Sequence, residues 1–251
     1  MPLSVVVITR DAATQLDACL RSAAFADEIL VVDSGSTDQT LKVAANFGAR
    51  IIEKQWLGFG PQKQFAVEAA AYDWVLCLDA DERVSEALKT AILAELAAPR
   101  GKACEMARCN RFLGRWLRHG EGYPDWSLRL FHRAHARWSD DAVHERVVSD
   151  QAPLRLEGDL LHDSAESLER YLEKQNRYTT LQARQLLSAG RSAGLGHLFF
   201  SPLLRFLKFY FLRLGFLDGL PGLIHILIGC TNSFNKYAKL IEFMNQSRTK
   251  R

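Results

Sequence analysis

Residues 74–82 read Trp-Val-Leu-Cys-Leu-Asp-Ala-Asp-Glu, an apolar run that ends in three acids, Asp79, Asp81 and Glu82. A short apolar run bounded by polar residues is typical of an interior strand, so the acids are expected at its carboxyl end. In an open α/β sheet, ligands bind at that edge. Two carboxylates separated by one small residue can hold a divalent cation, because hard cations prefer oxygen ligands. Asp79 and Asp81 are therefore candidate ligands of Mg²⁺ or Mn²⁺ placed against a diphosphate. Acids are also favoured wherever a helix begins, so this pattern alone does not require a metal.

The first 98 residues alternate between strand-like and helix-like segments. Leu3–Thr9 is apolar and rich in β-branched residues, which predicts a buried first strand. An alternation of strands and helices predicts a parallel sheet with right-handed crossovers. The expected order is strand 3–9, helix 12–24, strand 28–32, helix 39–47, strand 49–53, helix 65–71, strand 74–78 and helix 84–97.

Beyond Pro99 this alternation ends. Residues 104–162 are rich in Arg, Trp and His, with short strand candidates at 127–132 and 155–160. One long polar helix is expected over 164–187, followed by a hinge or loop and by two strongly apolar stretches, 198–217 and 220–230. We predict a catalytic α/β domain over 1–163, with a nucleotide half (1–98) and an acceptor half (99–163), and a helical region over 164–251.

The charge of the chain is concentrated at one end. The net charge is +3, but residues 191–251 hold nine Lys or Arg against two acids. A basic segment rich in Phe and Leu favours an anionic membrane surface over nucleic acid. Arg205, Lys208 and Arg213 interrupt its apolar stretch, which is too short to span a bilayer. A helix lying in the membrane interface is expected, with these bases reaching lipid phosphates; the same helices could instead close the core or form a dimer contact. The aromatic side chains expected to face lipid are Phe199, Phe200, Phe206, Phe209, Tyr210 and Phe211.

The cysteines and the N-terminus indicate a cytoplasmic protein. Five cysteines are present, an odd number, and none forms a Cys-x-x-Cys pair, so neither a disulfide framework nor a zinc site is indicated. Reduced, buried thiols are the expected state. The first residues lack the basic and apolar regions of a secretory signal.

Nucleotide binding would have to rely on side chains at strand ends. The dinucleotide fingerprint and the P-loop are both absent, since no glycine-rich turn precedes a predicted helix. Asp33, at the end of the second strand, could accept hydrogen bonds from a ribose or a base. Asp11 could contact the base, and Lys63 could neutralise a phosphate or contact the base.

Three blocks of sequence end the first, second and fourth predicted strands: Val5-Val6-Val7-Ile8-Thr9-Arg10-Asp11, Ile29-Leu30-Val31-Val32-Asp33-Ser34-Gly35-Ser36-Thr37-Asp38 and Leu78-Asp79-Ala80-Asp81-Glu82. Together they resemble the nucleotide-sugar half of family 2 glycosyltransferases of GT-A fold. Two later blocks, 123–131 and 141–146, resemble a narrower group, the lipopolysaccharide-core β-1,4-glucosyltransferases that act on the inner-core heptose. The Gln-x-x-Arg-Trp signature of processive members is missing, which argues against polymer synthesis.

The resemblance implies a metal-dependent transfer with inversion, from UDP-glucose to the lipid A–core heptose, at the cytoplasmic face of the inner membrane of a Gram-negative bacterium. Another family 2 transferase acting on a polyprenyl-linked or capsule acceptor is an alternative, as is a non-catalytic nucleotide-sugar-binding membrane protein. Asp81 and Asp79 are expected to hold the metal. Donor contacts are expected from Thr9, Arg10, Asp11, Asp33, Ser34, Gly35, Lys63, Asp79 and Ala80.

The acceptor hydroxyl must lose a proton as it attacks, and a carboxylate is the usual base in sugar chemistry. Glu145 is the first candidate and Asp125 the second; a surface salt bridge and a turn are their respective structural alternatives. Trp126 could stack on a sugar face or pack in the core. Arg129, Arg133 and Arg137 could bind an anionic acceptor or form a solvated face, and His132, His135 and His162 are expected to be structural.

Overall fold

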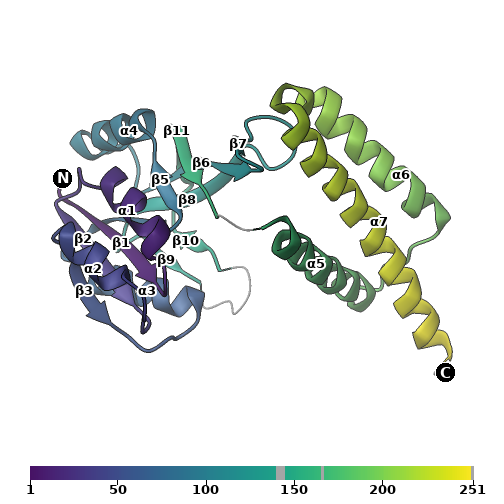
Figure 1. Cartoon of the computed structure of the whole chain (residues 1–251), viewed down its shortest axis with the longest axis horizontal. Coiled ribbons are helices and arrows are strands. Elements are labelled where there is room, and N and C mark those ends of the chain that lie inside the picture. Colours follow the sequence, from purple (N-terminus) through teal and green to yellow (C-terminus); the bar gives the residue numbers. More distant parts are fainter. Residues whose placement is uncertain (140–144, 165–166, 250–251) are drawn as a thin grey trace. The chain divides into compact units, whose positions relative to one another are not determined.

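The computed structural model describes residues 1–139, 145–164 and 167–249 (Figure 1). The chain divides into two compact units, residues 1–109 with 124–163, and residues 110–123 with 164–251. The second unit thus includes a segment, 110–123, that we predicted within the acceptor half. The strands and helices of the first unit are β1 (Leu3–Thr9), α1 (Ala13–Ser22), β2 (Glu28–Asp33), α2 (Thr40–Asn46), β3 (Arg50–Glu53), α3 (Phe59–Ala69), β4 (Trp74–Asp79), β5 (Glu82–Val84), α4 (Glu86–Ala97), most of β6 (Ala103–Phe112), β8 (Asp125–His132), β9 (Ala136–Trp138), β10 (Val147–Ser149) and β11 (Leu154–His162).

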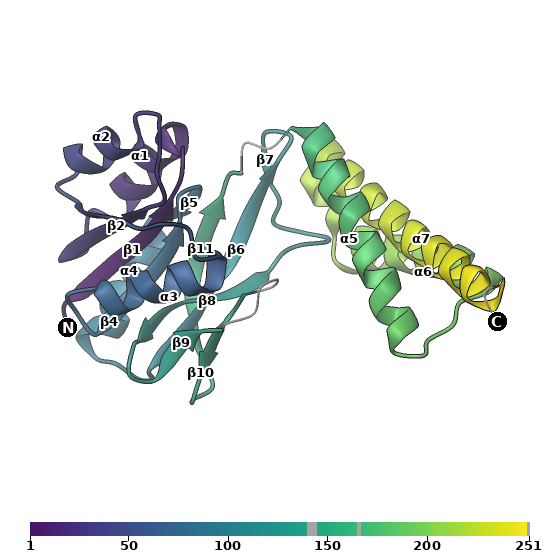
Figure 2. The same ribbon diagram turned by 90° about the horizontal axis from the view of Figure 1, so that it is seen from below.

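The first unit is built on one mixed sheet with the strand order β3-β2-β1-β4-β8-β6-β11-β5. The pairs from β3 to β4 are parallel, which confirms the order predicted for the first 79 residues. From β4 onward the sheet continues through antiparallel pairs, including β4–β8, β8–β6 and β11–β5. The strand candidates 127–132 and 155–160 therefore extend the same sheet. Figure 2 shows the helices of this unit lying against the sheet.

Both faces of the parallel half are covered, which explains why its strands are apolar throughout. Along β1, Val5 and Val7 belong to one buried cluster with α1 and α4, whereas Val6 belongs to a second cluster with α3. Successive side chains of a strand point to opposite faces, so a strand buried on both sides lacks the apolar–polar alternation of a half-exposed strand. Trp74, Leu76 and Leu78 of β4 continue the first cluster, and Val75 and Cys77 the second.

The second unit consists of β7 (Arg115–Trp116), α5 (Leu168–Ser188), α6 (Leu195–Phe206), a π-helical turn η1 (Leu207–Leu212), a 3₁₀ turn η2 (Gly215–Asp218) and α7 (Gly219–Thr249). The long helix predicted over 164–187 corresponds to α5. The apolar stretch predicted over 198–217 is divided among α6, η1 and η2, and Leu214, between η1 and η2, has a positive φ angle. Among the described residues, no single helix is long and apolar enough to span a membrane, although residues 195–212 and 215–247, bent by 75°, pass the same test as a pair.

Some side chains of the second unit differ from the expected lipid-facing arrangement. Arg205, expected to reach lipid phosphates, forms an ion pair with Glu121. Phe206, Phe209 and Tyr210 are partly buried rather than exposed, because they pack against neighbouring aromatic and cationic side chains of the same unit. The exposed aromatic residues of α6 and η1 are Phe199, Phe200 and Phe211.

All five cysteines are reduced thiols, and four of them are buried: Cys19, Cys77, Cys104 and Cys109. Burial raises the pKa of Cys77 to about 11 and that of Cys104 to about 12, because an apolar environment disfavours the thiolate. Cys230, on α7, is partly exposed.

Candidate active site

The carboxyl ends of β1, β2 and β4 meet at one edge of the sheet. The register pairs Thr9 with Asp33 and Ile8 with Asp79. The three blocks that end these strands are therefore neighbours in space, although up to 70 residues separate Thr9 from Asp79 in the chain. This is the edge where open α/β sheets bind ligands.

The Asp33 carboxylate organises the loop that follows β2. It is buried and accepts hydrogen bonds from the hydroxyls of Thr9 and Ser36 and from the backbone N–H groups of Gly35 and Ser36. Four donors occupy most of the acceptor capacity of a carboxylate. The geometry thus gives Asp33 a role in shaping the loop, and its predicted bond to a ribose or base stays a prediction.

The loop after β1 is tied to the same structure. Asp11 Oδ1 accepts from Thr37 N at 2.8 Å, and Asp11 N donates to Ser36 Oγ at 2.8 Å. Ser34 Oγ accepts from the buried Gln62 side chain at 3.1 Å. The predicted donor-binding residues Thr9, Asp11, Asp33, Ser34 and Gly35 therefore lie in two interlocked loops, whereas the neighbouring Arg10 side chain is exposed.

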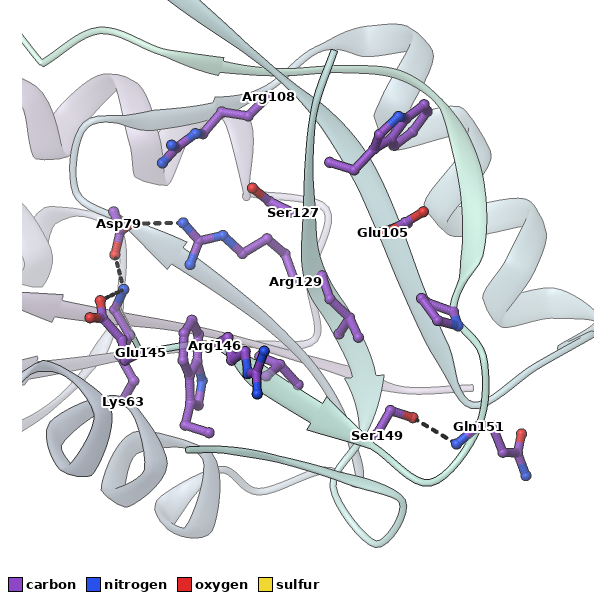
Figure 3. Close-up of a pocket in the computed structure, with 15 residues that line it drawn as sticks. Lys63, Asp79, Glu105, Arg108, Ser127, Arg129, Glu145, Arg146, Ser149 and Gln151 are labelled. Carbon is purple, nitrogen blue, oxygen red and sulfur yellow. Dashed lines mark hydrogen bonds and ion pairs between the residues drawn. The ribbon is translucent and has the colours of Figure 1, made fainter. Parts of the chain in front are cut away.

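Asp79 lies between two cations. Its Oδ1 is 2.9 Å from Lys63 Nζ and its Oδ2 accepts from Arg129 at 2.8 Å (Figure 3). Arg129 also donates to Glu82 Oε1 at 2.7 Å, and Glu82 Oε2 accepts from Asp79 N at 3.0 Å. Lys63 and Arg129 both lie over the buried ring of Trp138, at 4.6 and 5.6 Å from its centroid. A cation over an indole face is attracted to it, so Trp138 helps to hold both cations beside Asp79.

The two acids of this network respond differently to burial. Burial alone would raise the pKa of both, because a low dielectric disfavours the carboxylate. For Asp79 the charges of Arg129 and Lys63 outweigh burial, and its pKa lies well below its usual range. For Glu82 burial and the nearby Asp79 charge prevail over Arg129, and its pKa is raised. Asp79 is therefore ionised at neutral pH.

A pocket of about 490 Å³ opens beside this network. Glu145 lines it, and its Oε1 lies 3.4 Å from Lys63 Nζ, so the first candidate base is next to the cation that holds Asp79. The pocket is also lined by Glu105, Ser149 and Gln151 (Figure 3) and by Trp126, whose polar and aromatic side chains are of the kinds that can contact a sugar.

Asp125 has a different environment from Glu145. Among the described residues, it is outside the set that lines the pocket, and its Oδ2 is 2.7 Å from Arg108 in an ion pair. Glu145 therefore stays the first candidate for the base and Asp125 the second. The residues just before Glu145, Asp141 to His144, belong to the block 141–146 and lie outside the described residues.

Asp81 pairs with His162, whereas Asp79 pairs with Lys63 and Arg129. Asp81 Oδ2 lies 3.2 Å from His162 Nε2, and both side chains are partly exposed. A carboxylate and an imidazole are both common ligands of divalent metals such as Mn²⁺. In the described part of the chain, no three His, Cys, Asp or Glu side chains form a metal cluster. A site with one or two protein ligands fits a cation that is completed by water and substrate phosphates.

His162 is therefore a candidate metal ligand. The sequence analysis predicted only a structural role for this residue. The antiparallel pairing of β11 with β5 aligns His162 with Glu82 and so places the imidazole beside Asp81. Asp79, predicted to share the metal with Asp81, has both of its oxygens engaged by Lys63 and Arg129 instead.

The three arginines predicted either to bind an anionic acceptor or to form a solvated face, Arg129, Arg133 and Arg137, have different environments. Arg129 is buried within the network around Asp79, because the antiparallel pairing of β8 with β4 points its side chain to the end of β4. Arg133 pairs with Asp73 in an exposed ion pair at 3.0 Å. Arg137 lies on β9, and its side chain is exposed.

Replacing Arg129 tests how much the network contributes to stability. We expect Arg129→Met to lower the free energy of unfolding by about 3–5 kcal/mol, because it leaves buried acids without their cation. Arg133→Met, which removes an arginine from an exposed ion pair on the same segment, should cost about 1 kcal/mol or less. Urea denaturation of both variants measures the difference. Equal costs would show that the buried network contributes no more than a surface pair.

The match to known proteins agrees with this architecture. The model of glycosyl transferase family 2 matches residues 4–155. The chain belongs to this family and is a glycosyltransferase, which confirms the predicted family and, with it, the α/β fold of GT-A type.

Two curated relatives match nearly the whole chain. A lipopolysaccharide core biosynthesis glycosyltransferase, LpsC of Rhizobium meliloti (strain 1021), is 31% identical over 251 residues, which cover 96% of this chain and 93% of LpsC. The uncharacterized glycosyltransferase RT0209 of Rickettsia typhi is 29% identical over 259 residues, which cover 98% and 89% of the two chains. Among solved structures, S. aureus TarS 1-349 in complex with UDP-GlcNAc aligns with 98% of this chain and 92% of its own, at 16% identity and a TM-score of 0.47.

Proposed function

We propose that the enzyme transfers glucose from UDP-glucose, with inversion, to the heptose of the lipopolysaccharide inner core. The name of the relative LpsC supports a role in lipopolysaccharide core synthesis, and the match extends along almost the entire length of both chains. The blocks 123–131 and 141–146, which resemble the core glucosyltransferases, support the donor and the acceptor.

The observation that carries this proposal is the pocket in which Asp79, Lys63 and Glu145 meet. Glu145 would accept the proton of the acceptor hydroxyl as its oxygen attacks the anomeric carbon from the face opposite the leaving diphosphate. Lys63 and Arg129 would add positive charge close to that diphosphate. The interlocked loops of Thr9, Arg10, Asp11, Asp33, Ser34 and Gly35, with Ala80 after β4, would bind the nucleoside.

We further propose that Mg²⁺ or Mn²⁺ is required, with Asp81 and His162 as its protein ligands and Asp79 close by. When bound, such a cation stabilises the negative charge that develops on the leaving diphosphate. The pairing of a carboxylate with an imidazole at 3.2 Å supports this ligand set.

The enzyme would act in the cytoplasm, peripherally attached to the inner membrane, because its proposed acceptor is a lipid. The excess of basic residues after residue 190 supports an anionic lipid surface, and we propose no interaction with nucleic acid.

A panel of UDP-sugars tests the donor. The full-length enzyme should release UDP from UDP-glucose about tenfold faster than from UDP-galactose or UDP-N-acetylglucosamine. A site that hydrogen-bonds the glucose hydroxyls rejects the C4 epimer, whose hydroxyl points elsewhere, and the analogue whose C2 hydroxyl is replaced by an acetamido group. Adding lipid A–core that ends in the inner-core heptose should increase this release. A preference for another UDP-sugar would replace the proposed donor, and acceleration only by a polyprenyl-linked sugar would replace the acceptor. Absence of turnover with every donor and acceptor would favour a binding protein.

A further inference from the structure

Two leucines of the second unit have a backbone conformation that leucine rarely adopts. Of the non-glycine residues described, three have positive φ angles: Asp11, Leu113 (+47°) and Leu214 (+55°). The left-handed region is unfavourable for residues with a Cβ atom, and Asn, Asp and Gly tolerate it best. Leu113 precedes Gly114 in the tight turn between β6 and β7, a position where Asn is the favoured residue. The chain therefore keeps an apolar side chain at two sites where a polar one would be less strained.

Both leucines are exposed to solvent. The exposed fraction is 51% for Leu113 and 45% for Leu214, so neither side chain is retained to fill the core. Strained residues persist where function or the surrounding structure requires them. An exposed, strained leucine therefore suggests a use for the side chain outside the folded chain itself.

The two sites belong to one structure. Arg115, two residues after Leu113, donates to the carbonyl oxygen of Leu217 at 2.8 Å. Gly120 N donates to the carbonyl oxygen of Arg213, the neighbour of Leu214, at 2.8 Å. Asp218, buried after the break, accepts from the backbone N–H groups of residues 118 and 119 at 2.9 and 2.8 Å. The β6–β7 turn and the break between η1 and η2 are thus held together, with the polar groups of the break satisfied internally.

Around this junction, exposed apolar and basic side chains occur together. We call this set the break surface; its apolar members are Leu113, Leu207, Phe211, Leu212, Leu214, Phe216, Leu217 and Leu220, and its basic members are Arg111, Arg115, Arg118, Lys208 and Arg213. Leu212 is 81% exposed. The acid of segments 110–120 and 207–220 is Asp218, which is buried. The surface therefore presents positive charge beside apolar side chains.

We propose that the break surface inserts into the headgroup and upper acyl region of an anionic phospholipid leaflet. The leucines and phenylalanines would enter the acyl boundary, while Lys208 and Arg213 would bind lipid phosphates. The sign of the charge favours anionic lipid over zwitterionic lipid. This inference rests on the proposed membrane attachment. Of the lipid-facing aromatics expected from the sequence it keeps only Phe211, and it adds Phe216 and the exposed leucines of the two turns.

The double variant Leu113→Asn, Leu214→Asn separates the fold from membrane binding. Asn suits the left-handed conformation, so thermal unfolding should occur at an unchanged or higher temperature. Co-sedimentation with phosphatidylcholine vesicles containing phosphatidylglycerol should fall about tenfold or more, because two apolar side chains no longer enter the leaflet. The matched control is Leu93→Asn on α4, which also removes an exposed leucine (44% exposed) and should bind these vesicles as the unmodified chain does.

A charge variant provides the second measurement. Lys208→Gln with Arg213→Gln should lower binding to the anionic vesicles about tenfold or more, since each base near the surface contributes roughly 1 kcal/mol. It should not change the weak binding to vesicles of phosphatidylcholine alone. Vesicle binding that neither variant weakens would overturn the proposal. So would concentration-dependent dimerisation that the leucine variant abolishes in the absence of lipid, because it would assign the surface to a second copy of the chain.

UDP release from soluble donor provides a separate readout for the proposed function. It should be unchanged in all of these variants, because none of the substituted residues lies in the pocket. If no UDP-sugar is turned over but vesicle binding responds as expected, the proposed function fails while the break surface stands. If turnover is normal and vesicle binding does not respond, the reverse holds.

Discussion

Asp81→Ala should reduce sugar transfer by about 10³-fold or more while leaving the fold intact. The expected loss is large because a bound cation supplies several kcal/mol of charge stabilisation to a departing diphosphate. The fold should survive because the Asp81 side chain is partly exposed and its ion-pair partner, His162, also lies at the edge of the unit. Activity with Mn²⁺ and binding of Mn²⁺ in the presence of UDP are the two measurements, and circular dichroism checks the fold.

Two comparisons sharpen this result. Asp73→Ala removes an exposed acid just before the other end of β4 and should leave transfer unchanged. His162→Ala should weaken Mn²⁺ binding, as Asp81→Ala does, if both residues are ligands. Full activity of the unmodified enzyme in EDTA would show that the reaction needs no metal. Mn²⁺ binding that is unaffected by His162→Ala would show that His162 is not a metal ligand.

Glu145→Gln should lower turnover by about 10²-fold or more with little change in donor affinity. Gln keeps the size of the side chain and its ability to accept a hydrogen bond but cannot take up the proton of the acceptor hydroxyl. Lys63 contacts both Glu145 and Asp79, so a change at Glu145 can reach the donor site through Lys63. Calorimetry of UDP binding to the variant should therefore be used to show that the donor site is intact.

The rival base provides the control for this assignment. Asp125→Asn removes the negative charge of one ion-pair partner of Arg108 and should alter turnover much less than Glu145→Gln does. If Asp125→Asn alone shows a loss of turnover at constant donor affinity, Asp125 is the base and the role given to Glu145 is wrong.

The parallel half of the fold could be predicted because its signals are local. Leu3–Thr9 and Trp74–Leu78 are short apolar runs, and each ends in the polar residues that the fold brings to one edge. This pattern of apolar runs that end in polar residues was enough to predict that Asp79 and Asp81 lie at the carboxyl end of their strand. Likewise, the long polar pattern of residues 168–188 was sufficient to predict α5.

The partners of these acids could not be predicted in the same way. Arg129 and His162 reach the end of β4 through antiparallel pairings of β8 with β4 and of β11 with β5. Pairings between strands 50 or more residues apart leave no local pattern, and a one-residue change of register would turn both side chains to the opposite face. For the same reason, the sequence around Asp79 did not predict its ion pairs with Lys63 and Arg129.

The break after η1 was missed for a different reason. Residues 198–217 are mostly apolar, interrupted by Arg205, Lys208 and Arg213, and Leu214 carries no turn signal of its own. The conformation at Leu214 is set by contacts with the β6–β7 segment, about 100 residues earlier in the chain. Tertiary contacts here override the local preference of the residue.

The distribution of thiols offers a practical means of following the enzyme. Cys19, Cys77, Cys104 and Cys109 are shielded, and the raised pKa values of Cys19, Cys77 and Cys104 keep these three protonated at neutral pH. Cys230 is the accessible thiol of the chain, and although burial raises its pKa as well, a maleimide reagent can reach it. A fluorescent or spin label would therefore attach selectively to α7 of the second unit, without any engineered cysteine.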